Sequence, residues 1–188
     1  MIDVMLPELQ KVPSRQEIAV FLKKFNFKIL CEIGVREGEN LKSMLEAEPT
    51  EMVAVDTWCE DKNFRSRNPL MYSQEDLNRQ LQEVQVLQTQ FPNIKIIRNL
   101  STEAAKQFPD GYFDYVYIDA DHSYEAVRDD IKAWYPKVKQ FGVLGGHDYI
   151  RNSDKIFEGV NRAVNEFIDQ YKLCTHFEIS NSWYTIKP

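Results

Sequence analysis

Residues 115–127 read YVYIDADHSYEAV, in which an apolar and aromatic run ends in Asp119, Asp121 and His122. The residues that follow repeat apolar side chains at helical spacing, so the segment predicts a buried strand that leads directly into a helix. A strand followed by a covering helix is the building unit of a parallel sheet in an α/β protein. Charged side chains at the carboxyl end of such a strand lie where these sheets bind their ligands.

The same succession of strand and helix extends outward from this segment over most of the chain. Strands are expected at 27–34, 51–56, 93–99, 113–119, 142–148, 175–180 and 183–188. Helices are expected at 14–25, 40–47, 73–91, 102–108, 123–138 and 156–171. This order predicts a Rossmann-like, doubly wound α/β fold with a mainly parallel seven-stranded sheet, helices on both faces and a C-terminal antiparallel strand pair. We expect a single domain over residues 1–188, with 1–27 as an N-terminal helical extension.

Two of the expected helices begin with capping signals. Ser14 and Glu17 have the spacing of a capping box, and Ser73 and Asp76 resemble an N-cap pair. Such pairs can satisfy backbone N–H groups that the start of a helix leaves unbonded. The two pairs therefore place helix starts near residues 14 and 73.

The composition is that of an ordinary soluble globular protein, with 43% hydrophobic and 28% charged residues. A net charge of −6 argues against binding to nucleic acid or to an anionic membrane, because phosphate surfaces attract clustered Lys and Arg. The three cysteines are widely spaced and indicate reduced thiols. We find no secretory signal and no apolar segment of membrane-spanning length, so a cytoplasmic location is expected.

The first strand ends in CEIGVREGEN, where a dinucleotide-binding fold would carry its glycine loop. A dinucleotide site needs a second glycine for close approach of a pyrophosphate, and Arg36 stands at that position. The pattern is instead an acid, Glu32, followed by Gly34 and Gly38. It suits a ligand that has no pyrophosphate and carries a positively charged amino-acid head, such as S-adenosylmethionine. Taken alone, the two glycines are equally consistent with simple turns.

The second strand ends at Asp56, which lies 24 residues after Glu32. An acid at this position can accept hydrogen bonds from both hydroxyls of a ribose. Capping of a turn is the simpler alternative for an aspartate in this place. The two acids together are a stronger indication than either alone, because the fold places both loops beside one cleft.

A long irregular segment, residues 57–73, follows the second strand. Connections of this length without secondary structure are uncommon in a compact domain, and many of them are lids or binding loops. Trp58, Phe64 and Tyr72 favour a lid or acceptor loop that closes over a ligand, and a surface insertion is the alternative.

The fourth and fifth parallel strands end in IDADH and GGHDY and are expected to be neighbours. Asp119, Asp121 and His122 should therefore lie beside His147 and Asp148. A histidine has the near-neutral pKa that a general base needs. Capping of the following helix is the alternative explanation for the aspartates, and a local hydrogen bond is the alternative for His122.

The segment YIDADHSYEAVRDDIKAWYPKVKQFGVLGGHDY, together with the glycine pattern and Asp56, resembles the class I S-adenosylmethionine-dependent methyltransferases. The likeness runs from about residue 28 to the end. It is greatest to the small O-methyltransferases related to the macrocin and caffeoyl-CoA O-methyltransferases, whose sheets also close with an antiparallel pair. The resemblance implies methyl transfer from S-adenosylmethionine to a hydroxyl of a small molecule or of a sugar, with or without Mg²⁺ or another divalent cation.

The resemblance also assigns roles to individual residues. The positions that match the cofactor site are Glu32, Gly34, Gly38 and Asn40 at the methionine end, Asp56 and Thr57 at the ribose, Ser101 at the adenine, and Asp119. His122 matches the general base, with Asp119 as its catalytic partner. The positions that match the metal ligands are Asp119, His147 and Asp148. A hard cation prefers oxygen ligands, so His147 fits a softer metal better, or no metal.

Three residues depart from the family pattern, and several other functions stay open. Arg36 and Glu37 are charged where relatives are often small or aromatic, and Phe141 replaces the first glycine of a pair. The alternatives are a nicotinamide-dependent oxidoreductase, a metal-dependent hydrolase built on the Asp and His residues, and a binding protein without catalysis. The expected partner is a small-molecule acceptor, with no nucleic acid and no membrane, and a homodimer is left open.

Overall fold

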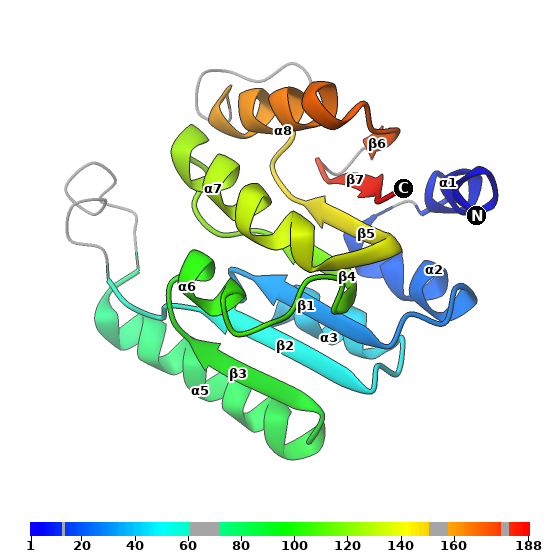
Figure 1. The fold of residues 1–188 in the computed structure, drawn as a ribbon. Helices are drawn as coiled ribbons and strands as arrows, with labels where there is room; N and C mark the ends of the chain where they lie inside the picture. The colour runs from blue at the N-terminus through cyan, green and yellow to red at the C-terminus, as the bar shows by residue number, and fades with distance from the viewer. Residues whose placement is uncertain (13, 61–71, 151–157, 178–180) are drawn as a thin grey trace.

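The computed structural model describes residues 1–12, 14–60, 72–150, 158–177 and 181–188 (Figure 1). The α-helices are α1 (Ile2–Leu9), α2 (Ile18–Lys24), α3 (Glu39–Leu45), α5 (Gln74–Gln90), α6 (Ser101–Ala105), α7 (Tyr124–Trp134) and α8 (Glu158–Tyr171). Short 3-10 turns lie at η1 (Arg15–Glu17) and η2 (Tyr135–Lys137). The strands are β1 (Ile29–Ile33), β2 (Glu51–Asp56), β3 (Ile94–Arg98), β4 (Phe113–Ile118), β5 (Val138–Gly146), β6 (Thr175–Phe177) and β7 (Trp183–Ile186).

The strands form one sheet in the order β3-β2-β1-β4-β5-β7-β6. The first five are parallel, whereas β7 runs antiparallel to both β5 and β6. The predicted fold class is therefore confirmed, including the closing antiparallel pair. From β1 the chain builds the sheet outward to β3 and then returns to β4, so the switch point lies between β1 and β4, where such sheets bind ligands.

Helices cover both faces of the sheet (Figure 1). The core on one face is formed with α1, α2, α3 and α5, and the core on the other face with α6, α7 and α8. Successive side chains of β4 face opposite sides of the sheet. Tyr115 and Tyr117 belong to the first core, and Val116 and Ile118 belong to the second. Among the described residues, no helix is both long enough and apolar enough to cross a membrane.

The N-terminal segment is helical as expected, but its details differ from the prediction. Within the helical extension predicted over 1–27, only a helix at 14–25 was located, so the bounds of α1 were not predicted. The predicted capping box at Ser14 and Glu17 does not form. A 3-10 turn precedes α2, so the N–H of Glu17 donates to the carbonyl of Ser14 at 2.9 Å, and the two side chains meet each other at 3.2 Å. The pair Ser73 and Asp76 does form a capping box at the start of α5.

Strand β5 begins at Val138, earlier than the sequence pattern indicates. Its pairing with β4 shifts register between Phe113 and Tyr115, as in a β-bulge. Phe141 lies inside this irregular part with φ +62°, a conformation that glycine adopts without strain. Phe141, which replaces the first glycine of the family's pair, therefore lies within β5.

Candidate active site

The ends of β1 and β4 approach each other closely at the switch point. The N–H of Asp119 donates to the carbonyl of Ile33 at 2.7 Å. Gly34 has φ +83°, and a Cβ atom built on it would lie 2.1 Å from the carbonyl oxygen of Asp119. No side chain fits at position 34, so this glycine is required for the first loop to lie against the end of β4.

Glu32 and Asn40 form a buried polar pair beside this crossing. The Asn40 amide donates to Glu32 Oε1 at 2.9 Å, and Glu32 is only 2% exposed. Glu32 Oε2 and Asn40 Oδ1 are buried and have no hydrogen-bond partner within the described part of the chain. Buried polar atoms are nearly always satisfied in a functional state, so these two oxygens indicate a ligand that brings hydrogen-bond donors. Burial raises the pKa of Glu32 to about 8.

Asp56 ends β2 with its carboxylate held between two backbone amides. Its Oδ2 accepts the N–H of Arg36 at 3.0 Å, and its Oδ1 accepts the N–H of Trp58 at 2.8 Å. Asp56 therefore does cap the turn, which was the simpler alternative for this aspartate. This capping also orients the carboxylate, and each oxygen keeps a lone pair for a further donor.

The predicted lid is described only at its two ends, because residues 61–71, and Phe64 with them, lie outside the described residues. The assignment of Trp58 to a closing loop is wrong, since its side chain is fully buried in the core and its indole N–H donates to the carbonyl of Arg36 at 2.9 Å. Tyr72 is exposed, and its hydroxyl accepts a hydrogen bond from Arg36, whose guanidinium lies 4.7 Å from the centre of the ring.

Thr57 and Ser101 lie at the ends of the neighbouring strands β2 and β3. The carbonyl of Thr57 accepts from Arg98 Nε at 3.0 Å. Ser101 opens α6, and its Oγ accepts the indole N–H of Trp134 at 2.8 Å. Burial raises the pKa of Asp130 to about 6 against the opposing effect of a hydrogen bond from Ser101. The hydroxyl of Ser101 therefore ties α6 to α7.

The structure brings together the acidic and imidazole groups expected at the ends of β4 and β5. His122 Nε2 lies 3.0 Å from Asp148 Oδ2 and 3.6 Å from Asp119 Oδ1. His147 Nδ1 lies 3.1 Å from Asp148 Oδ1 and 3.9 Å from Asp119 Oδ1. Asp121 instead accepts the N–H of Ser123 at 2.7 Å, so it caps the turn before α7.

Charges within this cluster set the protonation of its members. Burial by itself lowers the pKa of His122, but the nearby carboxylates of Asp119, Asp148 and Asp121 outweigh it and raise that pKa above its ordinary value. Burial also disfavours the ionised form of Asp119. The nearby imidazole of His122 and the charges of His147 and Arg15 nevertheless hold the pKa of Asp119 below its ordinary value.

Among the described residues, Arg15 belongs to this site although the sequence did not reveal it. It lies in η1 of the N-terminal extension, and its Nη1 donates to Asp119 Oδ2 at 2.5 Å. The two residues are 104 positions apart, and no motif connects them. Only the packing of α2 and η1 against α3 places the guanidinium here.

The predicted metal ligands lie near one another, but their surroundings do not suit a hard cation. The group whose ligand atoms all lie within 4.8 Å is Asp119, His122 and Asp148, so that His122 rather than His147 completes the set. Mg²⁺ demands oxygen ligands, whereas two imidazoles and the guanidinium of Arg15 surround these two carboxylates. The residues present therefore fit Mg²⁺ poorly.

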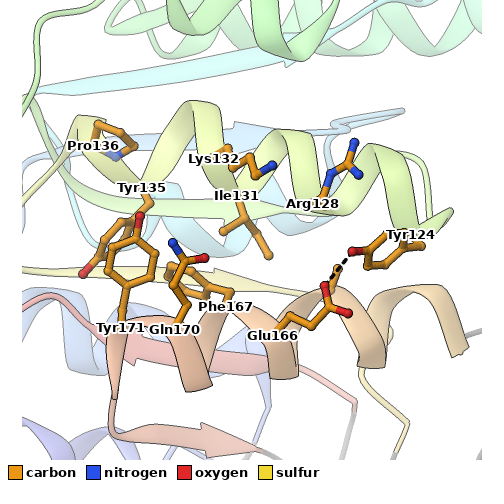
Figure 2. Close-up of a pocket in the computed structure, with 11 residues that line it drawn as sticks. Tyr124, Arg128, Ile131, Lys132, Tyr135, Pro136, Glu166, Phe167, Gln170 and Tyr171 are labelled. Atoms are coloured by element: carbon orange, nitrogen blue, oxygen red, sulfur yellow. Dashed lines mark hydrogen bonds between the residues drawn. The ribbon is translucent and has the colours of Figure 1, made fainter.

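A separate pocket of about 390 Å³ lies between α7 and α8 (Figure 2). Its lining includes Ile131, Tyr135, Phe167 and Tyr171, and none of the predicted site residues. At one end the hydroxyl of Tyr124 donates to Glu166 at 2.5 Å, and Figure 2 shows this bond bridging the two helices. The pocket therefore does not serve the strand-end site, although the bridge fixes the start of α7 next to the cluster.

The geometry described here is that of a class I S-adenosylmethionine-dependent methyltransferase, with acidic residues at the ends of β1, β2 and β4 around the switch point. Residues 31–149 match the family described as "Methyltransferase domain", and the chain belongs to this family. Comparison with curated protein sequences gives no significant match. Membership of this family sets aside the oxidoreductase and hydrolase alternatives.

Solved structures of low sequence identity share the fold. A putative caffeoyl-CoA O-methyltransferase from Staphylococcus aureus has 15% identity and a TM-score of 0.68, with 100% of this chain and 92% of that chain covered. The O-methyltransferase NovP has 17% identity and a TM-score of 0.67, with 95% and 79% covered. An O-methyltransferase from Bacillus cereus in complex with SAH has 10% identity and a TM-score of 0.60, with 99% and 88% covered.

Proposed function

We propose that the chain transfers the methyl group of S-adenosylmethionine to a hydroxyl of a small molecule, either free or on a sugar. The observation that carries this proposal is the position of His122. Its Nε2 lies among two carboxylates, at the same strand ends that hold the buried pair Glu32 and Asn40 and the oriented carboxylate of Asp56. A proton acceptor therefore stands beside a site with the right groups for the cofactor.

The cofactor residues suit the separate parts of S-adenosylmethionine. The ammonium group of its methionine supplies the donors that Glu32 Oε2 and Asn40 Oδ1 lack. The two oxygens of Asp56 can each accept a ribose hydroxyl, because their backbone bonds leave one lone pair on each. Gly34 lets the first loop lie against the end of β4, and Gly38, the N-cap of α3, lets the same loop pack against Leu87, so both shape the loop assigned to the methionine end. Ser101 is assigned to the adenine side.

The reaction is an in-line displacement at the methyl carbon. The imidazole of His122 accepts the proton of the acceptor hydroxyl while the oxygen forms a bond to the methyl carbon and the bond from that carbon to sulfur breaks. The products are the methyl ether, S-adenosylhomocysteine and a protonated His122. Asp119 and Asp148 stabilise the imidazolium that forms, as their effect on the pKa of His122 indicates. Alignment of oxygen, carbon and sulfur supplies the remainder of the rate increase.

The experiment that tests the cofactor assignment is calorimetric titration with S-adenosylhomocysteine. We expect Asp56→Ala to weaken binding by roughly tenfold to hundredfold, because two hydrogen bonds to a charged group are lost. Asp129→Ala removes an aspartate whose side chain is 49% exposed and should leave the affinity unchanged. Absence of binding to the unaltered protein would reject the proposed function, and equal affinity in Asp56→Ala would reject the ribose assignment.

Binding of S-adenosylhomocysteine should also depend on pH through Glu32. Burial raises the pKa of Glu32 to about 8, so the free protein holds this carboxyl mostly protonated at neutral pH. The ammonium group of the ligand favours the ionised form, and binding should therefore release a proton. We expect the affinity to fall by up to roughly tenfold per pH unit below the pKa of Glu32.

Titrations in buffers of different ionisation enthalpy measure this proton release directly. Glu32→Gln keeps the size of the side chain but cannot ionise, so its weaker binding should show neither the proton release nor this pH dependence. If the unaltered protein binds with the same affinity at pH values on both sides of that pKa, the ammonium group does not lie beside Glu32.

A further inference from the structure

We propose that the guanidinium of Arg15 takes the place of a divalent cation in this site and binds the oxygen of the acceptor beside His122. This inference rests on the proposed function and adds to it a residue from the N-terminal extension. It concerns the arrangement of charge around Asp119, where the prediction from sequence placed a metal ion.

The first argument is the geometry at Asp119. Arg15 Nη1 donates to Oδ2 of this carboxylate at 2.5 Å. The other oxygen, Oδ1, faces His122 Nε2 at 3.6 Å and His147 Nδ1 at 3.9 Å. The guanidinium therefore occupies one side of the carboxylate while the imidazoles occupy the other. The side chains of Arg15 and Asp119 are 21% and 19% exposed, so water screens this ion pair only partly.

The second argument is that Arg15 is held in position. It opens η1, and the helix that follows is anchored by Ile18 and Leu22, both fully buried. A guanidinium stays charged at ordinary pH, and that of Arg15 lies beside Tyr117 and Asp119. Tyr117 is itself fixed, because its hydroxyl lies 2.9 Å from that of Ser182. The guanidinium of Arg15 is thus permanently charged and has a fixed orientation.

The third argument is chemical. A guanidinium has five N–H donors in a rigid plane, so Arg15 can keep its bond to Asp119 and still donate to a further oxygen. As His122 removes the proton of the acceptor, negative charge develops on the acceptor oxygen. A fixed cation next to that oxygen stabilises the negative charge. A divalent cation in the same place would stabilise it in the same way.

The same charge should exclude a metal ion from the site. A divalent cation would have to share Asp119 with the guanidinium, and the two positive charges would repel each other at close range. Removal of Arg15 should leave two carboxylates and two imidazoles without a cation, and such a set suits Mn²⁺ or a softer metal. The proposal therefore predicts that the variant without Arg15 gains an affinity for metal.

Binding of Mn²⁺, followed by electron paramagnetic resonance and calorimetry, tests this prediction. We expect Arg15→Ala to bind Mn²⁺ at least about tenfold more tightly than the unaltered protein, because a like charge has been removed. The double variant Arg15→Ala/Asp119→Asn should lose this gain. Arg15→Lys, which keeps the charge, should resemble the unaltered protein, as should Arg79→Ala, which removes an exposed arginine on α5.

Tight, Asp119-dependent binding of Mn²⁺ to the unaltered protein would overturn the proposal, and so would the absence of any gain in Arg15→Ala that circular dichroism shows to be folded. Titration of the same variants with S-adenosylhomocysteine separates this failure from failure of the proposed function. Arg15→Ala should bind that ligand with unchanged affinity and turn over more slowly. If the affinity is lost instead, Arg15 binds the carboxylate of the cofactor, and its role at the acceptor oxygen is rejected.

Discussion

His122→Ala should lower kcat by about 10²- to 10⁴-fold, the usual contribution of a positioned general base. The affinity for S-adenosylhomocysteine should stay within about twofold, because the proposed role of His122 is to take the proton of the acceptor and not to bind the cofactor. The measurement is the release of S-adenosylhomocysteine with an acceptor found by screening small phenols and glycosides.

The pH profile gives a second readout of the same residue. The neighbouring carboxylates raise the pKa of His122 above its ordinary value, so the unprotonated base is lost as the pH falls through that raised pKa. The rate of the unaltered protein should therefore fall on the acidic side, and His122→Ala should lack this limb. His176→Ala, on β6, serves as a matched control and should keep both the rate and the profile. Unchanged turnover in His122→Ala would reject its role as the base.

Most of the sheet could be predicted because the pattern of apolar residues is local. Strand β2, predicted at 51–56, and strand β4, predicted at 113–119, lie within one residue of their observed bounds. Strand β5 was predicted too short, since its first half, from Val138 to Phe141, does not alternate apolar and polar residues and pairs past an irregularity in register. That pairing depends on the neighbouring strands and leaves no periodic signal in the sequence.

The site was predictable where topology alone brings residues together. Asp119, His122 and Asp148 end neighbouring parallel strands, so their proximity follows from the strand order. Arg15 could not be found in this way, because its position depends on how the N-terminal helices pack against the sheet. Trp58 was misplaced for a similar reason: its polar sequence neighbours suggest an exposed loop, whereas tertiary contacts bury the ring.

Gly34→Ala should destabilise the protein by about 3 kcal/mol or more, the sum of a left-handed backbone penalty and of overpacking. The added Cβ would lie 2.1 Å from the carbonyl oxygen of Asp119 and 2.6 Å from the Cα atom of Ala120. All of its nearest neighbours are backbone atoms, so relief requires β1 and β4 to separate at the switch point. We therefore expect weaker binding of S-adenosylhomocysteine even in the fraction that folds.

Gly111→Ala is the matched control for this prediction. Gly111 has φ +66°, close to the +83° of Gly34, but a Cβ built on it meets no atom within 4 Å. Its replacement should cost only the backbone penalty, about 1 kcal/mol. Urea unfolding followed by circular dichroism measures both losses. A large difference between the variants assigns the cost to the close crossing of β1 and β4, and equal losses would show that the backbone conformation of Gly34 matters and the crossing does not.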